Sequence, residues 1–422
     1  MRAAVAAALA AGALLVAAGC GSSNAATDGV RADAAQLVPP SALAFVSADA
    51  NLDSEGWKTL TDVYPIALDK EVARDLPAAV GDELNLAVVG VDNGKPDVVA
   101  IVKSNDEAKL RALAAKFDEG NEHYTVEDIA GWSVVADSTA NFQAVRIAST
   151  GTSLADTEEF KQAVSQLGGN ELAFAYANGA IVQKLKANLR SLVGAPRWVA
   201  ARVVAGKDDV RLDVQATGGG KAAVYKPTLL PDVPSGAALA VSFKNVNELI
   251  ARIQSQPALP TALAPFLTQL EGITGEGVLY VVPGGLLPVV TLEVRPKDSA
   301  AAAKSMRAIA GRLGSTMPLH VERQGSKVLL TNAAGNPGSS GSLVDDKQFK
   351  DALAAADVPD EVTWLAYADV PRLRPLIQAF SALLSTKDRK TTVEPNDKVG
   401  TVVAYGARTG ANSRLVVHAT HT

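Results

Sequence analysis

Histidine and carboxylate side chains are the residues of this sequence that could bind a metal ion or move a proton. His320 and Glu322 are two residues apart, so they would share one face of an extended strand and could begin a metal site. His418 and His421 stand at the extreme C-terminus, where fraying is expected, and His123 is isolated. Because no spacing supplies a third ligand, we interpret these histidines as surface or hydrogen-bonded side chains and expect neither a metal nor a cofactor.

Two acidic groups could form a cation site or an acid/base pair. They span residues 156–159 and 345–346, and each precedes a Phe-Lys pair at a predicted helix start. Carboxylates at such positions accept hydrogen bonds from free backbone amides and complement the helix dipole. We therefore interpret both groups as helix caps.

The segment from Gly338 to Ser342 has the residue types of a nucleophile loop, but a nucleophile needs a base that is held by a third group. We interpret it as a flexible connector that replaces residues 138–147 of the first half. The sequence has no GxSxG, HExxH or P-loop pattern, and no GxGxxG follows a strand. We expect no catalytic residues and no enzymatic activity.

The composition excludes further classes of protein. The chain has 422 residues, is 48% hydrophobic and carries a net charge of −5. A chain of this length can bury a large core, so it is not disordered, and the absence of a basic excess argues against nucleic acid as a partner. One Cys cannot form an internal disulfide bond.

The N-terminus has the pattern of an export signal. Arg2 is the only charged residue among the first 27, and residues 3–18 are Ala, Val, Leu or Gly. As a helix, these 16 residues would measure about 24 Å, less than the ~30 Å of a bilayer's hydrocarbon core. The run ends at Cys20, and small polar residues follow it.

Small residues directly before a Cys resemble the lipobox of bacterial lipoproteins, although Ala17 stands where Leu is commoner. The resemblance implies a signal peptide over residues 1–19 and a lipid on Cys20, followed by a flexible tether over residues 20–36. The protein would then be extracytoplasmic and anchored to the cell membrane. The alternatives are an ordinary secretory signal with an incidental Cys, or a buried thiol.

The elements that must position any site can be predicted from periodicity. Apolar residues at 110, 113, 114 and 117 mark one face of a helix, with Ser104 and Glu107 as a possible capping box. Strands are predicted over residues 84–91 and 97–102 around Asn93-Gly94, and over residues 124–129 and 132–136 around Ala130-Gly131. A helix over 156–167, a strand over 172–177, a helix over 180–192, and strands over 199–204 and 210–216 complete this half.

The same blocks recur in the second half of the chain. Residues 110–117 match 306–313, and four further blocks match in the same order: 38–46 with 233–241, 153–161 with 342–350, 171–178 with 361–369, and 210–217 with 413–420. Five ordered matches indicate an internal duplication, with one unit over 37–226 and another over 227–422. We expect an α+β fold in which each unit is an antiparallel sheet with helices on one face and a ferredoxin-like start.

One difference between the halves suggests a contact surface. The hairpin of the first half turns through polar residues 92–96, whereas that of the second half carries Leu286 and Leu287. Two leucines at a tip would expose apolar area unless something covers them. We expect them to contact a partner, the membrane or the first unit.

The mature chain resembles a bacterial family known as domain of unknown function 3352, whose members are exported or membrane-tethered. The resemblance rests on residues 37–46, on 131–137, and on 153–156 with Phe160, and it covers most of residues 37–420. It implies a cell-envelope location, and it brings no catalytic residues with it.

These observations favour a non-catalytic lipoprotein of the cell envelope, a binding or scaffolding module with an envelope protein or a lipid as possible partner. The alternative is a carrier of an apolar or lipid-like ligand in a cleft between the two units. A hydrolase is the least favoured class, because the sequence is poor in site signatures.

Overall fold

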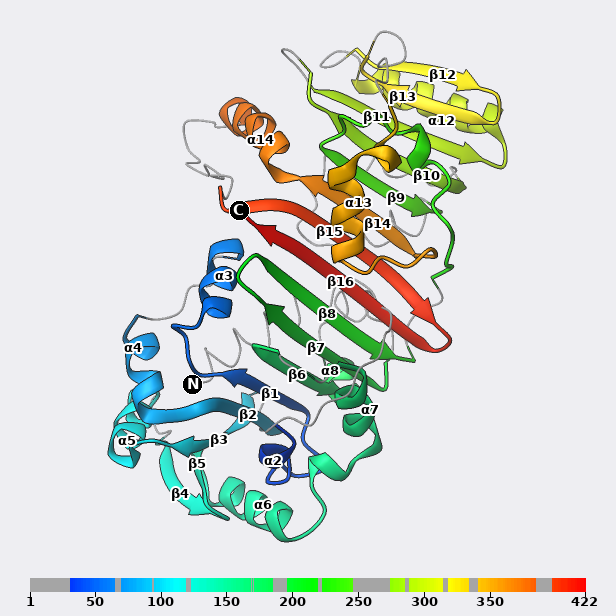
Figure 1. Ribbon diagram of the computed structural model, residues 1–422. Helices are drawn as coiled ribbons and strands as arrows, with labels where there is room; N and C mark the ends of the chain where they lie inside the picture. Colours follow the sequence, from blue (N-terminus) through cyan, green and yellow to red (C-terminus); the bar gives the residue numbers. More distant parts are fainter. Residues whose placement is uncertain are drawn as a thin grey trace. The chain divides into compact units, whose positions relative to one another are not determined.

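The chain divides into two compact units. Figure 1 shows the computed structural model, coloured along the sequence. Unit 1 comprises residues 1–220 with 409–415, and unit 2 comprises residues 221–408 with 416–422. The described residues are 31–64, 70–92, 95–118, 123–167, 169, 171–184, 196–218, 222–245, 274–284, 288–313, 318–333, 341–384 and 397–422. Within these residues, we find no helix with the length and apolarity needed to cross a membrane.

The first half of the chain alternates strands and helices. Its elements are α2 (Arg31–Ala35), β1 (Ala44–Asp49), α3 (Glu55–Val63), α4 (Lys70–Ala79), β2 (Val80–Asp92), β3 (Lys95–Ser104), α5 (Glu107–Ala115), β4 (Thr125–Ile129), β5 (Trp132–Ala136), α6 (Thr139–Thr150), η1 (Leu154–Asp156), α7 (Glu158–Leu167), β6 (Ala173–Asn178), α8 (Gly179–Lys184), β7 (Trp198–Ala205) and β8 (Asp209–Thr217).

The second half has fewer described helices. Its elements are η2 (Leu230–Asp232), β9 (Leu239–Lys244), β10 (Gly275–Val282), β11 (Val289–Pro296), α12 (Ser299–Leu313), β12 (His320–Gln324), β13 (Lys327–Thr331), η3 (Leu343–Asp345), α13 (Lys347–Ala355), β14 (Trp364–Asp369), α14 (Val370–Leu384), β15 (Val399–Thr409) and β16 (Asn412–His421).

The predicted fold class is wrong. We expected two α+β units, each with its own sheet and a ferredoxin-like start, but the described strands belong to one antiparallel sheet of 16 strands. Their order is β12-β13-β11-β10-β9-β14-β15-β16-β8-β7-β6-β1-β2-β3-β5-β4. A ferredoxin-like split βαβ unit joins parallel strands through its helix, whereas β1 and β2 are antiparallel neighbours.

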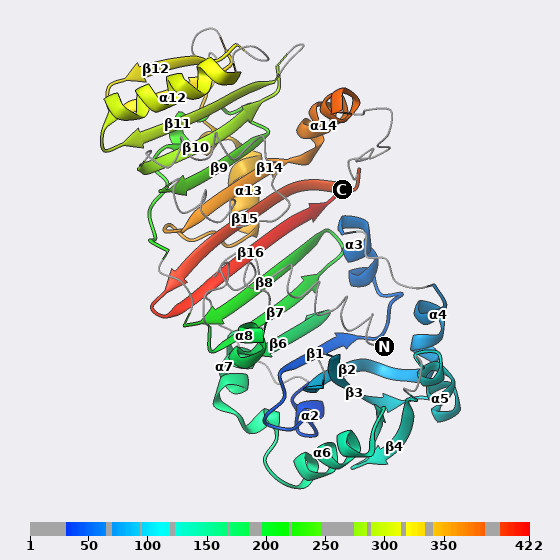
Figure 2. The same cartoon turned by 180° about the vertical axis from the view of Figure 1, so that it is seen from behind.

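Helices cover both faces of the unit 1 strands, not one face as we expected. Val99 and Ile101 of β3 belong to a core cluster with residues of α2, α6 and α7, whereas Ala100 and Val102 belong to another with residues of α5. Because neighbouring side chains of a strand point to opposite faces, these two clusters lie on opposite sides of β3. Figure 2 shows the same elements from behind.

The unit 2 strands are also covered on both faces. Ala240 of β9 belongs to a cluster with residues of η3 and α13, and its neighbour Val241 packs against a cluster with residues of α12. Aromatic rings anchor the α13 side, where Phe349 meets Tyr367 edge-on with ring centroids 5.0 Å apart. On the matching side of unit 1, Phe160 meets Tyr176 at 5.2 Å.

Several local predictions are confirmed. The strands around Ala130-Gly131 form a two-residue hairpin in which Ile129 pairs with Trp132, and both turn residues have positive φ, at 54° and 75°. The helix at residues 110–117 is α5, but its cap is not the predicted box. Asp106 caps α5 by accepting a hydrogen bond from Lys109 N at 3.1 Å, and Ser104 Oγ donates to Ala79 O instead.

Candidate functional site

The second acidic group caps the predicted helix, whereas Asp156 of the first group caps the short helix η1 and not α7. Asp156 and Ser153 form a capping box, in which Ser153 N and Oγ donate to Asp156 Oδ2 at 2.9 and 2.8 Å. These hydrogen bonds, that from the backbone first, lower the pKa of the Asp156 carboxyl. Asp346 is the N-cap of α13 and accepts from Gln348 N at 2.8 Å and from Phe349 N at 3.3 Å.

The histidines do not converge. His123 Nδ1 lies 3.1 Å from Asp118 Oδ2, and His320 and Glu322 lie on β12. Across the described ranges, no three His, Cys, Asp or Glu side chains gather as metal ligands would. The expectation of a frayed C-terminus is wrong, because β16 continues to His421 and His418 is buried, at 2% exposed.

Other predicted site residues lie outside the described residues. They are the lipid-attachment Cys20, the contact residues Leu286 and Leu287, and residues 338–340 of the serine-rich loop. The described end of that loop is held in place, because Ser342 Oγ donates to Pro231 O at 2.8 Å. Cys20, Leu286 and Leu287 therefore stay predictions.

A cleft of about 800 Å³ lies in unit 2, along α13 from its N-cap to its last residue, at the start of α14 and at the adjoining ends of β15 and β16. Helix α13 supplies one wall, α14 another, and the two strands the floor. The lining residues are Asp346, Lys347, Gln348, Asp351, Ala352, Ala355, Pro371, Arg372, Gly400, Thr401, Thr420 and Thr422.

The strand register explains why this space is open. In unit 1, β6 ends at Asn178, which pairs with Trp198 of β7, and Trp198 is fully buried, at 0% exposed. In unit 2, β14 ends at Asp369, which pairs with Thr401 of β15. Thr401 therefore stands where unit 1 has an indole ring, and the smaller side chain leaves room beside it.

The residues that follow these strands confirm the correspondence. Asn178 Oδ1 accepts a hydrogen bond from Ile181 N, and Asp369 Oδ1 accepts one from Arg372 N, both at 3.2 Å. Each caps the helix that comes next. Arg372 therefore stands where unit 1 has Ile181, so a cation replaces an apolar side chain at the edge of the cleft.

Helix α13 also carries a smaller residue than its counterpart. Counting from Phe160 of α7 and Phe349 of α13, Gln166 corresponds to Ala355, and Ala163 corresponds to Ala352. The apolar part of the wall that α13 contributes to the cleft thus consists of two alanines. Residues three apart on a helix share a face, so these methyl groups form one small apolar surface.

The charged residues of the cleft are partly paired. Arg372 Nε lies 3.0 Å from Asp369 Oδ2, and Asp369 is buried. Within the described part of the chain, Nη1 and Nη2 of Arg372 make no hydrogen bond. Lys347 forms an ion pair with Asp351 one turn along α13, and both of these side chains are exposed.

Hydroxyl groups form the floor. Thr420 Oγ1 accepts a hydrogen bond from Thr401 N at 2.7 Å and lies 3.1 Å from Thr401 Oγ1. Burial raises the pKa of Tyr367 of β14 to about 12, with Asp369 and Asp346 adding to the effect. The phenol therefore stays protonated at neutral pH and adds no negative charge near Asp369 and Asp346.

This set of groups is suited to holding a ligand. Guanidinium, ammonium, carboxylate and hydroxyl groups donate and accept hydrogen bonds, while Ala352, Ala355 and Pro371 offer apolar contacts. Among the described residues of the lining there is neither a histidine nor a cysteine, the usual base and thiol nucleophile.

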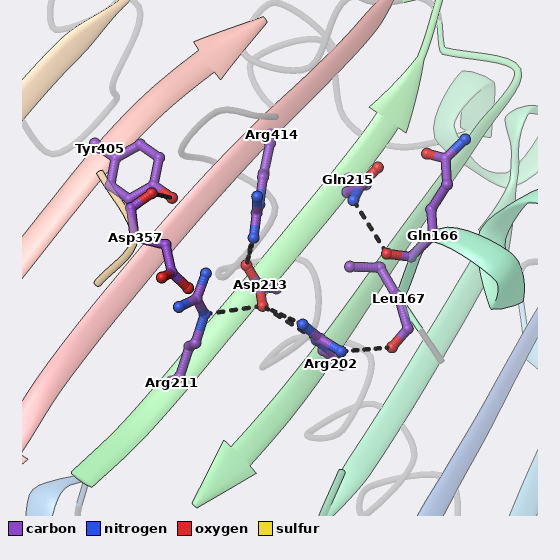
Figure 3. Close-up of polar contacts among 9 residues, drawn as sticks. All are labelled: Gln166, Leu167, Arg202, Arg211, Asp213, Gln215, Asp357, Tyr405 and Arg414. Atoms are coloured by element: carbon purple, nitrogen blue, oxygen red, sulfur yellow. Dashed lines mark hydrogen bonds and ion pairs between the residues drawn. The ribbon is translucent and has the colours of Figure 1, made fainter. Parts of the chain in front are cut away.

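Unit 1 contains a buried ion cluster (Figure 3). Asp213 of β8 is fully buried and accepts hydrogen bonds from three arginines: Arg202 of β7, Arg211 of β8 and Arg414 of β16. Arg202 Nη1 also donates to Leu167 O at 3.3 Å. This cluster ties α7 to three strands, so we assign it to the stability of unit 1.

The residues of the cleft were not found from the sequence. The block that pairs Tyr176–Asn178 with Tyr367–Asp369 was recognised, but the difference lies in the strands that pair with it, where Trp198 of β7 is opposite Asn178 and Thr401 of β15 is opposite Asp369. When one unit has a large aromatic residue and the other has a small residue at the corresponding position, side-chain volume is missing from the second unit.

Comparisons with known proteins found no similar protein. No family model matches the chain, and neither the curated proteins nor the solved structures gave a match. The resemblance to domain of unknown function 3352 stays a prediction.

Proposed function

We propose that this protein is a non-catalytic binding module of the bacterial cell envelope, which holds a small ligand in the cleft of unit 2. The exported, lipid-anchored state rests on the apolar segment over residues 3–18 and on the small residues before Cys20. Ligand binding rests on the cleft. The observation that carries it is Thr401 in the place of Trp198.

The structural argument for binding is that unit 1 fills the space beside β7 with the ring of Trp198, whereas unit 2 has the smaller Thr401 at the corresponding position. The cleft is open to solvent, and about 800 Å³ beside charged and hydroxyl groups offers a ligand both contact area and hydrogen bonds. The polar lining favours a ligand with polar groups over a purely hydrocarbon one. A carrier of a lipid-like ligand remains the alternative proposal.

The test is a Thr401→Trp variant, which gives unit 2 the residue that unit 1 has. We expect small molecules that co-purify with the wild-type protein from bacterial membranes to be lost from this variant, as measured by native mass spectrometry. Ala354→Trp is the matched control, because Ala354 is an exposed residue of α13 outside the lining.

Two results would overturn the proposed ligand site. If wild type and Thr401→Trp retain the same ligand to the same extent, the cleft is not where it binds. If an acyl lipid co-purifies with both proteins, the alternative of a lipid carrier is favoured.

The anchor is tested separately on the same preparation. We expect an acyl group on Cys20 as the first residue of the mature chain, and we expect Cys20→Ser to release the protein from membranes. An unmodified Cys20 within an intact N-terminus would contradict the lipoprotein assignment.

A further inference from the structure

We propose that the ligand of the unit 2 cleft is a small ring-containing carboxylate, bound with its ring beside Thr401 and its carboxylate on Arg372. This inference rests on the proposed function, because it names the chemical class that the same cleft would take. It combines two differences between the units, one in volume and one in charge.

The difference in volume specifies a ring. In unit 1 the position opposite Asn178 is filled by the indole of Trp198, which shares a core cluster with Ala163 of α7. In unit 2 the corresponding alanine, Ala352, lines the cleft together with Ala355 and Pro371. A flat apolar group of about the size of an indole would therefore meet the kind of surface on which Trp198 packs in unit 1.

The difference in charge specifies an anion. Arg372 stands in the place of Ile181, and its Nε is fixed by the buried Asp369 at 3.0 Å. A guanidinium held at Nε presents Nη1 and Nη2 as a planar pair of donors, the geometry that binds both oxygens of a carboxylate. The remaining charges of the lining do not compete for this role, because Asp346 caps α13 and Asp351 is paired with Lys347.

One molecule can carry both the ring and the carboxylate because Arg372 and Thr401 lie next to the same residue, Asp369. Arg372 forms an ion pair with Asp369, and Thr401 is its partner on the neighbouring strand. The ring and the carboxylate of the ligand would therefore be separated by no more than a short linker. Indole-3-acetate has this composition and serves as the probe. Indole, which lacks the carboxylate, and acetate, which lacks the ring, are the matched comparison compounds.

The experiment measures binding of the three probes to the full chain by isothermal titration calorimetry. For the wild-type protein we expect indole-3-acetate to bind at least about tenfold more tightly than indole, and acetate to bind the weakest. Arg372→Ile, which restores the residue of unit 1, should remove the preference for the acid and leave indole binding unchanged. Arg372→Gln, which keeps a hydrogen-bond donor for Asp369, is the second variant in case Arg372→Ile does not fold.

The outcomes separate this inference from the proposed function. If indole and indole-3-acetate bind equally to the wild type, or if neither binds, the carboxylate class is wrong, while ligand binding in the cleft is still decided by the co-purification test. If the preference for the acid survives in both Arg372 variants, Arg372 is not the anion site. If Thr401→Trp binds the probes as the wild type does, both the inference and the cleft as the ligand site are overturned.

Discussion

Arg414 donates two hydrogen bonds to the same oxygen of Asp213, from Nε at 3.1 Å and from Nη2 at 2.9 Å. The second oxygen of Asp213 accepts from Arg202 and Arg211, each at 3.0 to 3.1 Å. One fully buried carboxylate thus holds guanidinium groups from three strands (Figure 3). The cost of removing either partner from such a pair is large, because the other charge is left buried.

The first prediction concerns the stability that Asp213 provides. We expect Asp213→Ala to lower the free energy of unfolding by about 3–5 kcal/mol, because three arginines lose their shared acceptor and one of them, Arg414, is buried. Urea denaturation measures the change. Asp351→Ala removes an exposed carboxylate that is paired with Lys347, so it serves as the control and should cost less than about 1 kcal/mol. Equal losses in the two variants would contradict the prediction.

The second prediction concerns pH. Burial alone would raise the pKa of the Asp213 carboxyl, but the charges of Arg414, Arg211 and Arg202 outweigh it and lower that pKa. A carboxyl whose pKa is lower in the folded state stabilises the fold above its unfolded pKa, about 3.9, and this contribution is lost as the pH falls from there.

We therefore expect the difference in free energy of unfolding between wild type and Asp213→Asn to be constant from about pH 7 to pH 5 and to shrink below about pH 4. Urea titrations at pH 7, 5, 4 and 3 measure it. A difference that grows on acidification would show that the carboxylate is not held in its charged form.

The third prediction concerns the hairpin between β4 and β5. Ala130 has a φ of 54°, a conformation that costs most L-residues about 1–2 kcal/mol and that Asn tolerates better. Ala130→Asn should raise the free energy of unfolding by about 0.5–1 kcal/mol, and Gly131→Ala, at a φ of 75°, should lower it. Thermal unfolding of both variants checks the two signs, and the same sign for both would contradict the turn assignment.

Local structure of this kind could be predicted because its signals lie within a few residues. The turn at Ala130-Gly131 and the apolar face at Leu110 and Leu113 each depend on near neighbours in sequence, and the structure has both. The cap of α5 was misplaced by two residues because Ser104 and Asp106 are both good capping types. Sequence alone does not decide which of the two ends the preceding strand.

The errors in the fold concern pairing over long distances. Helices were expected on one face, yet Val98 to Val102 of β3 is an unbroken apolar run, and such runs are typical of strands that are buried on both faces. That signal was present and was not used. The joining of the strands into one sheet of 16 depends on hydrogen bonds at strand edges, which leave no periodic pattern in the sequence.

The candidate site could be predicted only in part, for the same reason. The capping role of Asp346 follows from its position before α13, whereas Asp156 caps η1 as its third residue and not the predicted helix. The cleft depends on the register that places Thr401 opposite Asp369, and its meaning appears only when that register is compared with Trp198 opposite Asn178. Such a comparison needs both pairings, and neither is local.

The last prediction compares how substitutions at Trp198 and at Thr401 change the free energy of unfolding. Trp198→Thr removes a fully buried ring from the core of unit 1, and truncation of a buried aromatic residue costs about 3–5 kcal/mol. Thr401→Trp places the same ring in space that is already open, so it should change the free energy of unfolding by less than about 1 kcal/mol, or increase it. Urea denaturation of the two variants gives both values.

Trp198→Phe is the matched control for the loss of the ring. The Nε1 donor of Trp198 is buried and has no hydrogen-bond partner among the described residues, so its removal should cost little, while the remaining ring keeps most of the packing. We therefore expect Trp198→Phe to lose clearly less than Trp198→Thr. If Thr401→Trp instead destabilises the protein as much as Trp198→Thr does, the space beside Thr401 is not shaped for a ring, and the proposed class of ligand would have to be smaller.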